Sequence, residues 1–331
     1  MSEHDCYRIL FFQMSANIFD TGHEDLIHDV AFDFYGKRLA TCSSDQRIKV
    51  WEHNSKMNSW ETVDTWKAHD CSILKVTWAH PEFGQVLASC SFDRSVCIWE
   101  EQENEPRNSG RRFVQRARIQ DSLKSVQDIE FAPNILGLKL AACAADGIVR
   151  IYEFLEVTNL EDYTCMDEFE INPGSITKEV DGHYCISWCP SRFNPPMMVV
   201  GCGKEAKIFR QDGQSKWQAY EVLSGHEDTV HDVSWAPTMG RLVSPHYFLF
   251  SEDQHVRIYK ITSDRTRYLA ELLCSFRDHN VEVWRVEWNV TGTILSSSGD
   301  DGKVRLWKAA DGEWKCMSIL SYDRQSEHSE M

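Results

Sequence analysis

Short runs in which apolar and polar residues alternate recur along the chain. In five of them a turn Asp is followed six residues later by an aromatic residue, with apolar residues at alternate positions between the two. The five runs are residues 45–51, 93–99, 146–152, 253–259 and 301–307, and a sixth copy at 203–209 lacks the Asp. Alternation after a turn residue predicts a tight turn that leads into a half-buried strand.

Three more strand-like runs accompany each copy, two before it and one after it. For the first copy they are residues 27–34, 38–43 and 60–66. The closing aromatic residues of successive copies are 48 to 57 residues apart, somewhat more than the ~40–45 residues of an average WD40 blade, so we expect long connecting loops. Four strands at a fixed period indicate blades around an axis rather than a two-sheet sandwich. We therefore predict an all-β, six-bladed WD40-type propeller over residues 21–321.

The strand count leaves one strand over. Every copy has its own outer strand, the last at residues 314–320, yet residues 7–19 also read as a strand within an N-terminal extension, residues 1–20. In a closed propeller of the usual kind the N-terminal strand supplies the outer strand of the last blade. We expect the spare strand to belong to a seventh blade whose other strands come from a partner, because an open ring invites β-addition. The alternative is a closed six-bladed ring with one of these two strands outside it.

The open ring predicts a set of residues that line the gap. They are apolar residues of the spare strand, of the first blade and of the last blade. The set is Ile9, Phe11, Ile18, Ile27, Val30, Phe32, Leu39, Trp284, Val286, Leu295 and Leu306.

A His precedes the first strand of four copies and predicts a hydrogen-bonded network inside each blade. In the first blade His23 would bond Asp45 and a strand hydroxyl, Thr41 or Ser43, which in turn meets the indole of Trp51. A His, Asp and Ser grouping also suggests catalysis, but its recurrence favours a structural role, so we predict no catalytic residue. The other members are His69, Asp93, Trp99, His226, Asp253, His279, Asp301 and Trp307.

Four of the 12 cysteines follow the same repeat. Cys42, Cys90, Cys143 and Cys202 stand at equivalent places on the second strand of four blades, where a reduced Cys acts as a small hydrophobic residue. The close pairs 90/97 and 185/189 lack the second pair that a zinc site needs. The sequence therefore predicts no metal and no cofactor.

Charge and hydropathy limit the partners further. The formal net charge of −16, from 35 basic and 51 acidic residues, argues against direct binding to nucleic acid or to an anionic membrane. Apolar runs fall short of the ~20 residues of a membrane-spanning helix, so we expect no membrane insertion. Residues 9–12 are too short an apolar run for a secretion signal. We expect residues 322–331 to form a disordered acidic tail.

Several strings are more specific than a general WD40 pattern. In the first blade they are HEDLIHDV at 23–30 and GKRLATCSSD at 36–45, and in the second VTWAHPEFG at 76–84. These strings resemble two sister families, the Seh-type nucleoporins and the small WD40 subunit of the COPII outer coat. In the later blades ADGIVRIYE at 145–153 and WRVEWNVTGT at 284–293 favour the Seh type. The resemblance extends from about residue 20 to residue 320.

The resemblance implies a function that the residues alone do not. Seh-type proteins are non-enzymatic, open six-bladed propellers. A β-blade from the N-terminus of a helical scaffold nucleoporin completes them within the Y-shaped nuclear pore complex, which serves mRNA export, protein transport and pore assembly. They also join other WD40 and helical subunits in a SEA/GATOR-type complex that regulates TOR signalling. The expected locations are thus the nuclear envelope, the vacuolar or lysosomal membrane surface and a cytoplasmic pool.

Two other functions remain as alternatives. One is a COPII outer-coat subunit that acts in vesicle budding. The other is a peptide-reading WD40 adaptor, for which a cluster of Arg on one face would be needed. The nearest cluster is Arg111, Arg112, Arg116 and Arg118, which we expect to form a solvated face of an outer strand.

Overall fold

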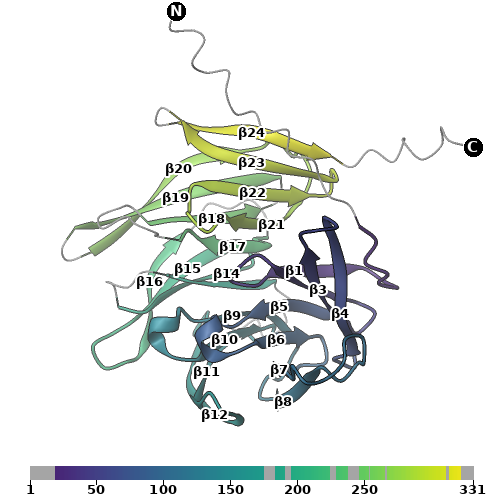
Figure 1. Ribbon diagram of the computed structural model, residues 1–331. Coiled ribbons are helices and arrows are strands. Elements are labelled where there is room, and N and C mark those ends of the chain that lie inside the picture. The colour runs from purple at the N-terminus through teal and green to yellow at the C-terminus, as the bar shows by residue number, and fades with distance from the viewer. Residues whose placement is uncertain are drawn as a thin grey trace, which may run out of the picture.

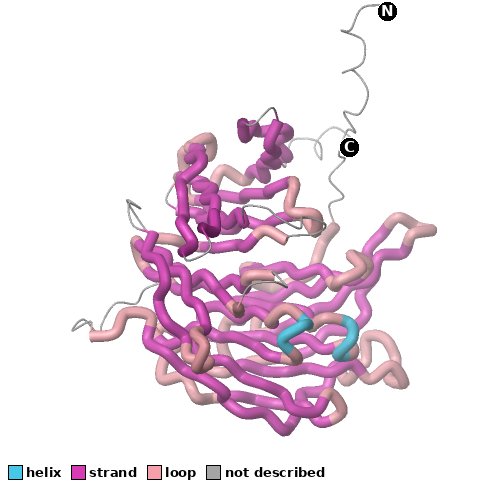
Figure 2. Tube along the Cα trace, turned by 90° about the vertical axis from the view of Figure 1, so that its left-hand side faces the viewer, coloured by secondary structure: helices cyan, strands magenta, loops and turns pink. Residues whose placement is uncertain are grey.

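The computed structural model describes residues 19–174, 183–190, 195–223, 229–237, 246–252, 254–264, 267–310 and 313–321. These residues form six antiparallel sheets of four strands, each sheet built from strands that follow one another in the chain (Figure 1). Figure 2 shows that the described chain is almost entirely strand and loop, apart from short helical turns at Pro81–Phe83 and Asn134–Leu136. The predicted six-bladed, all-β propeller is confirmed.

Each blade runs from an inner strand near the axis to an outer strand at the rim. Blade 1 comprises β1 (Ile27–Phe32), β2 (Arg38–Ser43), β3 (Arg47–Asn54) and β4 (Ser59–Lys67). Blade 2 comprises β5 (Ile73–Trp78), β6 (Val86–Ser91), β7 (Val96–Glu101) and β8 (Phe113–Ile119). Blade 3 comprises β9 (Val126–Phe131), β10 (Lys139–Ala144), β11 (Ile148–Glu156) and β12 (Asn159–Glu170).

The second half of the chain repeats this plan. Blade 4 comprises β13 (Tyr184–Trp188), β14 (Met197–Cys202), β15 (Glu205–Gln211) and β16 (Trp217–Leu223). Blade 5 comprises β17 (Asp232–Trp235), β18 (His246–Glu252), β19 (His255–Asp264) and β20 (Arg267–Phe276). Blade 6 comprises β21 (Val283–Trp288), β22 (Ile294–Gly299), β23 (Lys303–Ala310) and β24 (Glu313–Ser321).

The turn between the second and third strands follows from the Asp that the repeat places there. In blade 1 the carboxylate of Asp45 accepts the backbone N–H of Arg47 at 2.9 Å, and Asp93, Asp146 and Asp301 make the same bond in their blades. The residue after the Asp has a positive φ, which glycine adopts at least cost. It is Gln46 in blade 1 and Gly147 and Gly302 in blades 3 and 6.

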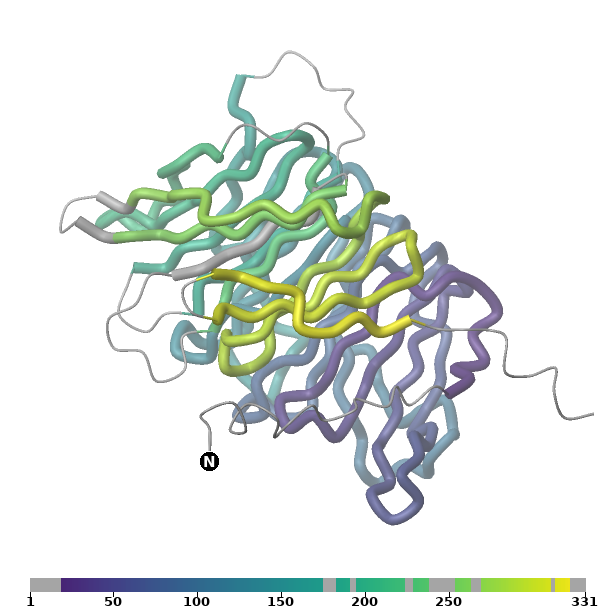
Figure 3. Tube along the Cα trace, turned by 90° about the horizontal axis from the view of Figure 1, so that it is seen from above, coloured from purple at the N-terminus to yellow at the C-terminus, as the bar shows by residue number. Residues whose placement is uncertain are grey.

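Five apolar cores join successive blades. Each core combines one face of a blade with the facing side of the next, from blades 1 and 2 through to blades 5 and 6. Figure 3 shows blade 6, in yellow, beside blade 1, in purple. Within the described residues no such core joins these two blades. The ring is therefore open on this side.

Candidate partner-binding site at the open side of the ring

The inner strand of blade 1 exposes a face that the other blades bury. Ile27 is 40% exposed, whereas its equivalents in three other blades are 0% exposed: Ile73, Val126 and Val283. Val30 is 46% exposed, whereas its five equivalents are at most 3% exposed: Val76, Ile129, Ile186, Val233 and Val286. In those blades this face packs against the preceding blade. Blade 1 has no described blade in that place.

The outer strands reveal the same break in the repeat. At one fixed position the outer strand of a blade meets the closing aromatic residue of the next blade. Trp66 of blade 1 lies 5.5 Å from Trp99, and Phe276 of blade 5 lies 4.4 Å from Trp307, between ring centroids. The corresponding pairs in the intervening blades share a core or a ring contact: Ile119 with Tyr152, Phe169 with Phe209, and Leu223 with Tyr259.

Blade 6 does not continue this series. Leu320 stands at the equivalent position of blade 6 but belongs to none of the described cores. The ring of Trp51 in blade 1 instead meets Phe19, with 5.2 Å between their centroids, and Phe19 also stacks on Trp60 at 6.2 Å. Phe19 is the last residue of the sequence run that we predicted as a spare strand. Ile9, Phe11 and Ile18 of that run lie outside the described residues.

The gap has an apolar wall on the blade 1 side. Phe32, 57% exposed, lies in line with Leu39 and Trp51 across the sheet, and its ring is 5.9 Å from that of Trp60. Leu39 is on this wall but only 5% exposed. Together with Ile27 and Val30, these side chains form a surface that is apolar from the inner strand to the outer strand.

The blade 6 side differs from the sequence prediction. Side chains alternate between the two faces of a strand, and Val286 and Leu295 point toward blade 5, where they are 3% and 0% exposed in the shared core. They do not line the gap. The opposite face carries Leu306, aligned with Ser296 and Ser318 across the sheet.

Trp284 lies in a different environment again. It falls where the pairing of β21 with β22 is interrupted, between Val283 and Arg285. Its indole N–H donates to the carboxylate of Asp300 at 2.6 Å, and its ring centroid is 4.5 Å from that of His231 in blade 5. Trp284 is thus held beside blade 5 rather than on a wall of the gap. The inner strands of blades 1 and 2 are interrupted at the same place, so the irregular pairing belongs to the repeat.

A single arginine spans the seam near the axis. The guanidinium of Arg285 in blade 6 donates to the carbonyl oxygens of His28 in blade 1, at 3.2 Å, and of Leu74 in blade 2, at 3.4 Å. It also lies 3.6 Å from a carboxylate oxygen of Asp29 and 3.7 Å from one of Asp232. Burial alone lowers the pKa of Arg285, but these carboxylates raise it above its usual value. The open ring is therefore tied at its inner rim by a charged group.

The predicted blade networks lie within single blades. In blade 1 His23 bonds Asp45 at 2.7 Å and Thr41 at 2.9 Å, and the indole N–H of Trp51 donates to the same Thr41 hydroxyl at 3.2 Å. Blades 2 and 6 contain the same set of contacts through His69, Asp93, Ser89 and Trp99 and through His279, Asp301, Ser297 and Trp307. His226 and Asp253 lie outside the described residues.

The environment of these histidines fits a structural role. Burial lowers the pKa of His23 and of His279 below the usual imidazole value, although Asp45 and Asp301 beside them act in the opposite direction. Each network spans the inner loop and the second and third strands of one blade, so it stiffens that blade. The His–Asp–hydroxyl grouping recurs as a repeat and does not converge on one cleft.

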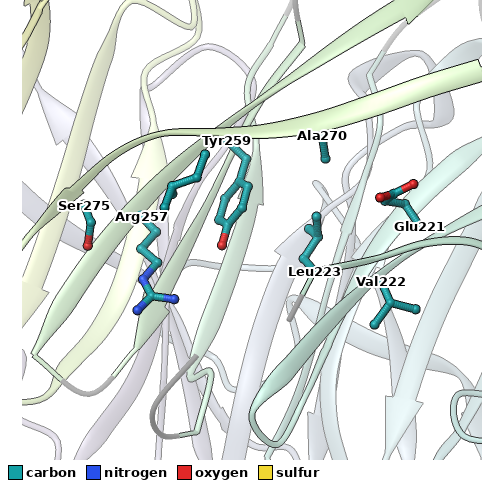
Figure 4. Close-up of a pocket in the computed structure, with 8 residues that line it drawn as sticks. Glu221, Val222, Leu223, Arg257, Tyr259, Ala270 and Ser275 are labelled. Atoms are coloured by element: carbon teal, nitrogen blue, oxygen red, sulfur yellow. The ribbon is translucent and has the colours of Figure 1, made fainter. Parts of the chain in front are cut away.

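The remaining candidate sites contain little that suggests chemistry. The arginines of the outer-strand cluster face carboxylates, with Arg112 2.6 Å from Glu101 and Arg116 2.7 Å from Glu100. A groove of about 450 Å³ lies between β16 and the outer strands of blade 5, where Val222, Leu223 and Tyr259 line it beside Glu221 and Arg257 (Figure 4). Within the described part of the chain, no cluster of His, Cys, Asp and Glu is arranged to hold a metal ion. The helices there are also too short and too polar to span a bilayer.

Comparison with known proteins agrees with this geometry. The WD domain, G-beta repeat family matches residues 16–52, 60–100, 217–260 and 270–308. Nucleoporin SEH1 of Saccharomyces cerevisiae is 40% identical, over 92% of this chain and 98% of its own length. Nucleoporin seh1 of Schizosaccharomyces pombe is 40% identical over 95% and 98%, and human Nucleoporin SEH1 is 43% identical over 90% and 86%.

The chain belongs to the SEH1 nucleoporin family. The SEH1 family is a family of WD-repeat structural scaffold proteins and not of enzymes. The predicted Seh-type family and the predicted absence of catalysis are therefore confirmed, and the protein has a nucleoporin scaffold role.

Proposed function

We propose that this protein is a non-catalytic subunit of the nuclear pore scaffold that binds a helical nucleoporin by accepting a β-blade from it. One observation carries the proposal. Ile27 and Val30 are exposed in blade 1, whereas the same positions are buried by the preceding blade elsewhere in the ring. A donated blade would bury them, and each apolar side chain so covered contributes roughly 1.5–3 kcal/mol at most.

The position of Phe19 supports a particular form of the partner. Phe19 meets Trp51 as Trp66 meets Trp99, so it stands where the outer strand of a preceding blade would stand. In the proposed seventh blade Phe19 therefore takes the place of an outer-strand residue. The partner then needs to donate only the three inner strands.

The wider cellular role is proposed from the family resemblance. In the Y-shaped nuclear pore complex the subunit contributes to pore assembly, mRNA export and protein transport at the nuclear envelope. In a SEA/GATOR-type complex it joins other WD40 and helical subunits at the vacuolar or lysosomal surface and regulates TOR signalling, and a cytoplasmic pool links the two. Both roles use the same gap, because any partner that donates a blade competes for it.

Affinity capture tests the proposal. The wild-type chain and a Val30→Asp variant are expressed at native level, and the proteins that co-elute with each are identified by mass spectrometry. We expect the wild type to retain a helical nucleoporin and Val30→Asp to lose it, because the new carboxylate would be buried without a partner. Leu155→Asp is the matched control, since Leu155 is an aliphatic side chain, 63% exposed, at the end of β11 in blade 3.

The outcomes separate the candidate functions. Loss of the nucleoporin with Val30→Asp but not with Leu155→Asp supports capture through the gap. Equal retention by both variants would overturn it. Recovery of COPII coat proteins alone would support the coat alternative instead. Recovery of short peptides that still bind Val30→Asp would support the adaptor alternative.

A further inference from the structure

At two of the blade junctions the inner strands carry a second contact that passes from one blade to the next. There the side chain before the last position of the inner strand accepts a backbone N–H from the following blade. In blade 3 the carboxylate of Glu130 accepts the N–H of Trp188 in blade 4 at 2.7 Å. In blade 4 the hydroxyl of Ser187 accepts the N–H of Trp235 in blade 5 at 3.1 Å. These bonds satisfy N–H groups at the free edge of an inner strand, which would otherwise be costly to bury.

Glu287 occupies this position in blade 6. It pairs with Ser296 as Glu130 pairs with Ala141, and it precedes the terminal Trp288 as Glu130 precedes Phe131. Unlike Glu130, Glu287 is exposed, and its carboxylate makes no hydrogen bond among the described residues. The following blade, from which the N–H would come, is the one missing from the ring.

The second strand of this wall is also polar where the second strands of blades 1, 2 and 3 are apolar. On the second strand the positions that face the next blade are Ser296 and Ser298 in blade 6. The same positions hold an Ala and a Cys in each of blades 1, 2 and 3: Ala40 and Cys42, Ala88 and Cys90, and Ala141 and Cys143. The two sides of the gap thus differ: the wall on blade 1 is apolar, whereas on blade 6 an acceptor and two hydroxyl groups lie beside Leu306.

We propose that Glu287 accepts a backbone N–H from the inner strand of the donated blade and so sets the register of that strand against blade 6. The inference rests on the proposed function, because it needs a partner strand in the gap. It also assigns the faces of the partner. The donated sheet places its apolar side against Val30 and Phe32, and its side with a free N–H and small polar groups against Glu287, Ser296 and Ser298.

Affinity and hydrogen exchange test the proposal together. The probe is the helical nucleoporin recovered by the capture experiment, purified with its N-terminal region intact, and its binding is measured for the wild type, Glu287→Ala, Glu287→Gln and Glu161→Ala. We expect Glu287→Ala to weaken binding about tenfold, a typical loss for a hydrogen bond to a charged group. Glu287→Gln keeps an acceptor oxygen, so its affinity stays within about threefold of the wild type.

Hydrogen exchange separates this role from a general effect on folding. In the complex with Glu287→Ala, one amide of the inner partner strand exchanges faster, while the isolated variant unfolds like the wild type. Glu161→Ala, an exposed glutamate on β12, changes neither measurement. Unchanged affinity and unchanged amide protection with Glu287→Ala would overturn the inference. If the wild type binds no blade-donating partner at all, it is the proposed function that fails.

Discussion

The interface between blades 1 and 2 and the seam between blades 6 and 1 are built from the same repeat but differ in what covers them. Ile73 and Val76 of blade 2 are buried at 0% and 1%, whereas Ile27 and Val30, at the same places in blade 1, are 40% and 46% exposed. The strands, the turns and the His–Asp–Trp networks are alike in both blades. Each blade therefore forms its own internal structure, and burial of its apolar face depends on the neighbour.

The two regions also use charge differently. At the closed interface Lys75 lies 3.9 Å from Asp29 and 3.6 Å from Asp128, beside an apolar core that already joins blades 1 and 2. At the seam Arg285 makes the corresponding contacts with Asp232 and Asp29, but no apolar core of described residues joins blades 6 and 1. Arg285 is longer than Lys75 and has more hydrogen-bond donors. At the seam it joins the blades that apolar packing joins elsewhere. The seam is thus held at the axis and open toward the rim.

The largest expected difference comes from placing a carboxylate in each region. Val76→Asp buries an unpaired charge in the core of blades 1 and 2, so we expect the free energy of unfolding to fall by more than about 4 kcal/mol. Val30→Asp changes an exposed side chain of the isolated protein, with an effect within about 0.5 kcal/mol. Urea denaturation of both variants makes the comparison, and similar losses would show that the gap is closed in solution.

The aromatic contacts provide a second comparison. Trp66→Ala removes a side chain, 5% exposed, from the core next to Trp99, and we expect a loss of about 3–5 kcal/mol. Phe19→Ala removes one partly exposed ring from Trp51 at the seam, with a loss of about 1 kcal/mol. Denaturation followed by tryptophan fluorescence measures both. A loss for Phe19→Ala as large as that for Trp66→Ala would mean that Phe19 belongs to a fully closed core.

The charged tie across the seam gives a smaller but local effect. Arg285→Ala leaves Asp29 and Asp232 without this counter-charge, and we expect a loss of about 2 kcal/mol because the arginine is about one-third exposed. Hydrogen exchange should rise first in β1 and β21. Arg47→Ala, an exposed arginine of blade 1, is the control. Exchange that rises evenly over all six blades would argue against a tie at the seam.

The smallest effect concerns pH at a closed interface. Burial raises the pKa of Glu130 to about 8 from its usual value of 4.5. Because the folded state favours the protonated form, this group's contribution to stability is greatest below about pH 4.5 and is lost as the pH rises through 8. Glu130→Gln keeps the acceptor for Trp188 and removes the titration. We therefore expect the variant to gain stability relative to the wild type as the pH rises from 5 to 8.5.

Denaturation at several pH values checks this expectation. The control is Glu161→Gln, which changes an exposed carboxylate on β12 and should follow the wild type throughout. A relative stability of Glu130→Gln that does not change with pH would show that Glu130 is ionised in the folded protein.

Much of the seam was predictable from the blade repeat, and the errors arose on blade 6. Counting strands predicted a missing blade, and Ile27, Val30 and Phe32, which we expected at the gap, are exposed in the structure. In blade 6 the alternation identified two faces but not which of them points to the gap, so Val286 and Leu295 were assigned to the wrong one. The sequence places Glu287 at the same repeat position as Glu130. That this position accepts a backbone N–H is seen only in the contact between Glu130 and Trp188.

Turn residues, strand alternation and the His–Asp–Trp networks act within one repeat of about 50 residues, so the amino-acid pattern is enough to predict the blades. Which repeated positions stay exposed follows from the assembled ring. Burial of Val76 and exposure of Val30, the reach of Arg285 across the seam and the place of Phe19 on Trp51 all depend on which blades become neighbours. That is a property of ring closure, since identical local patterns acquire different surroundings where the ring ends.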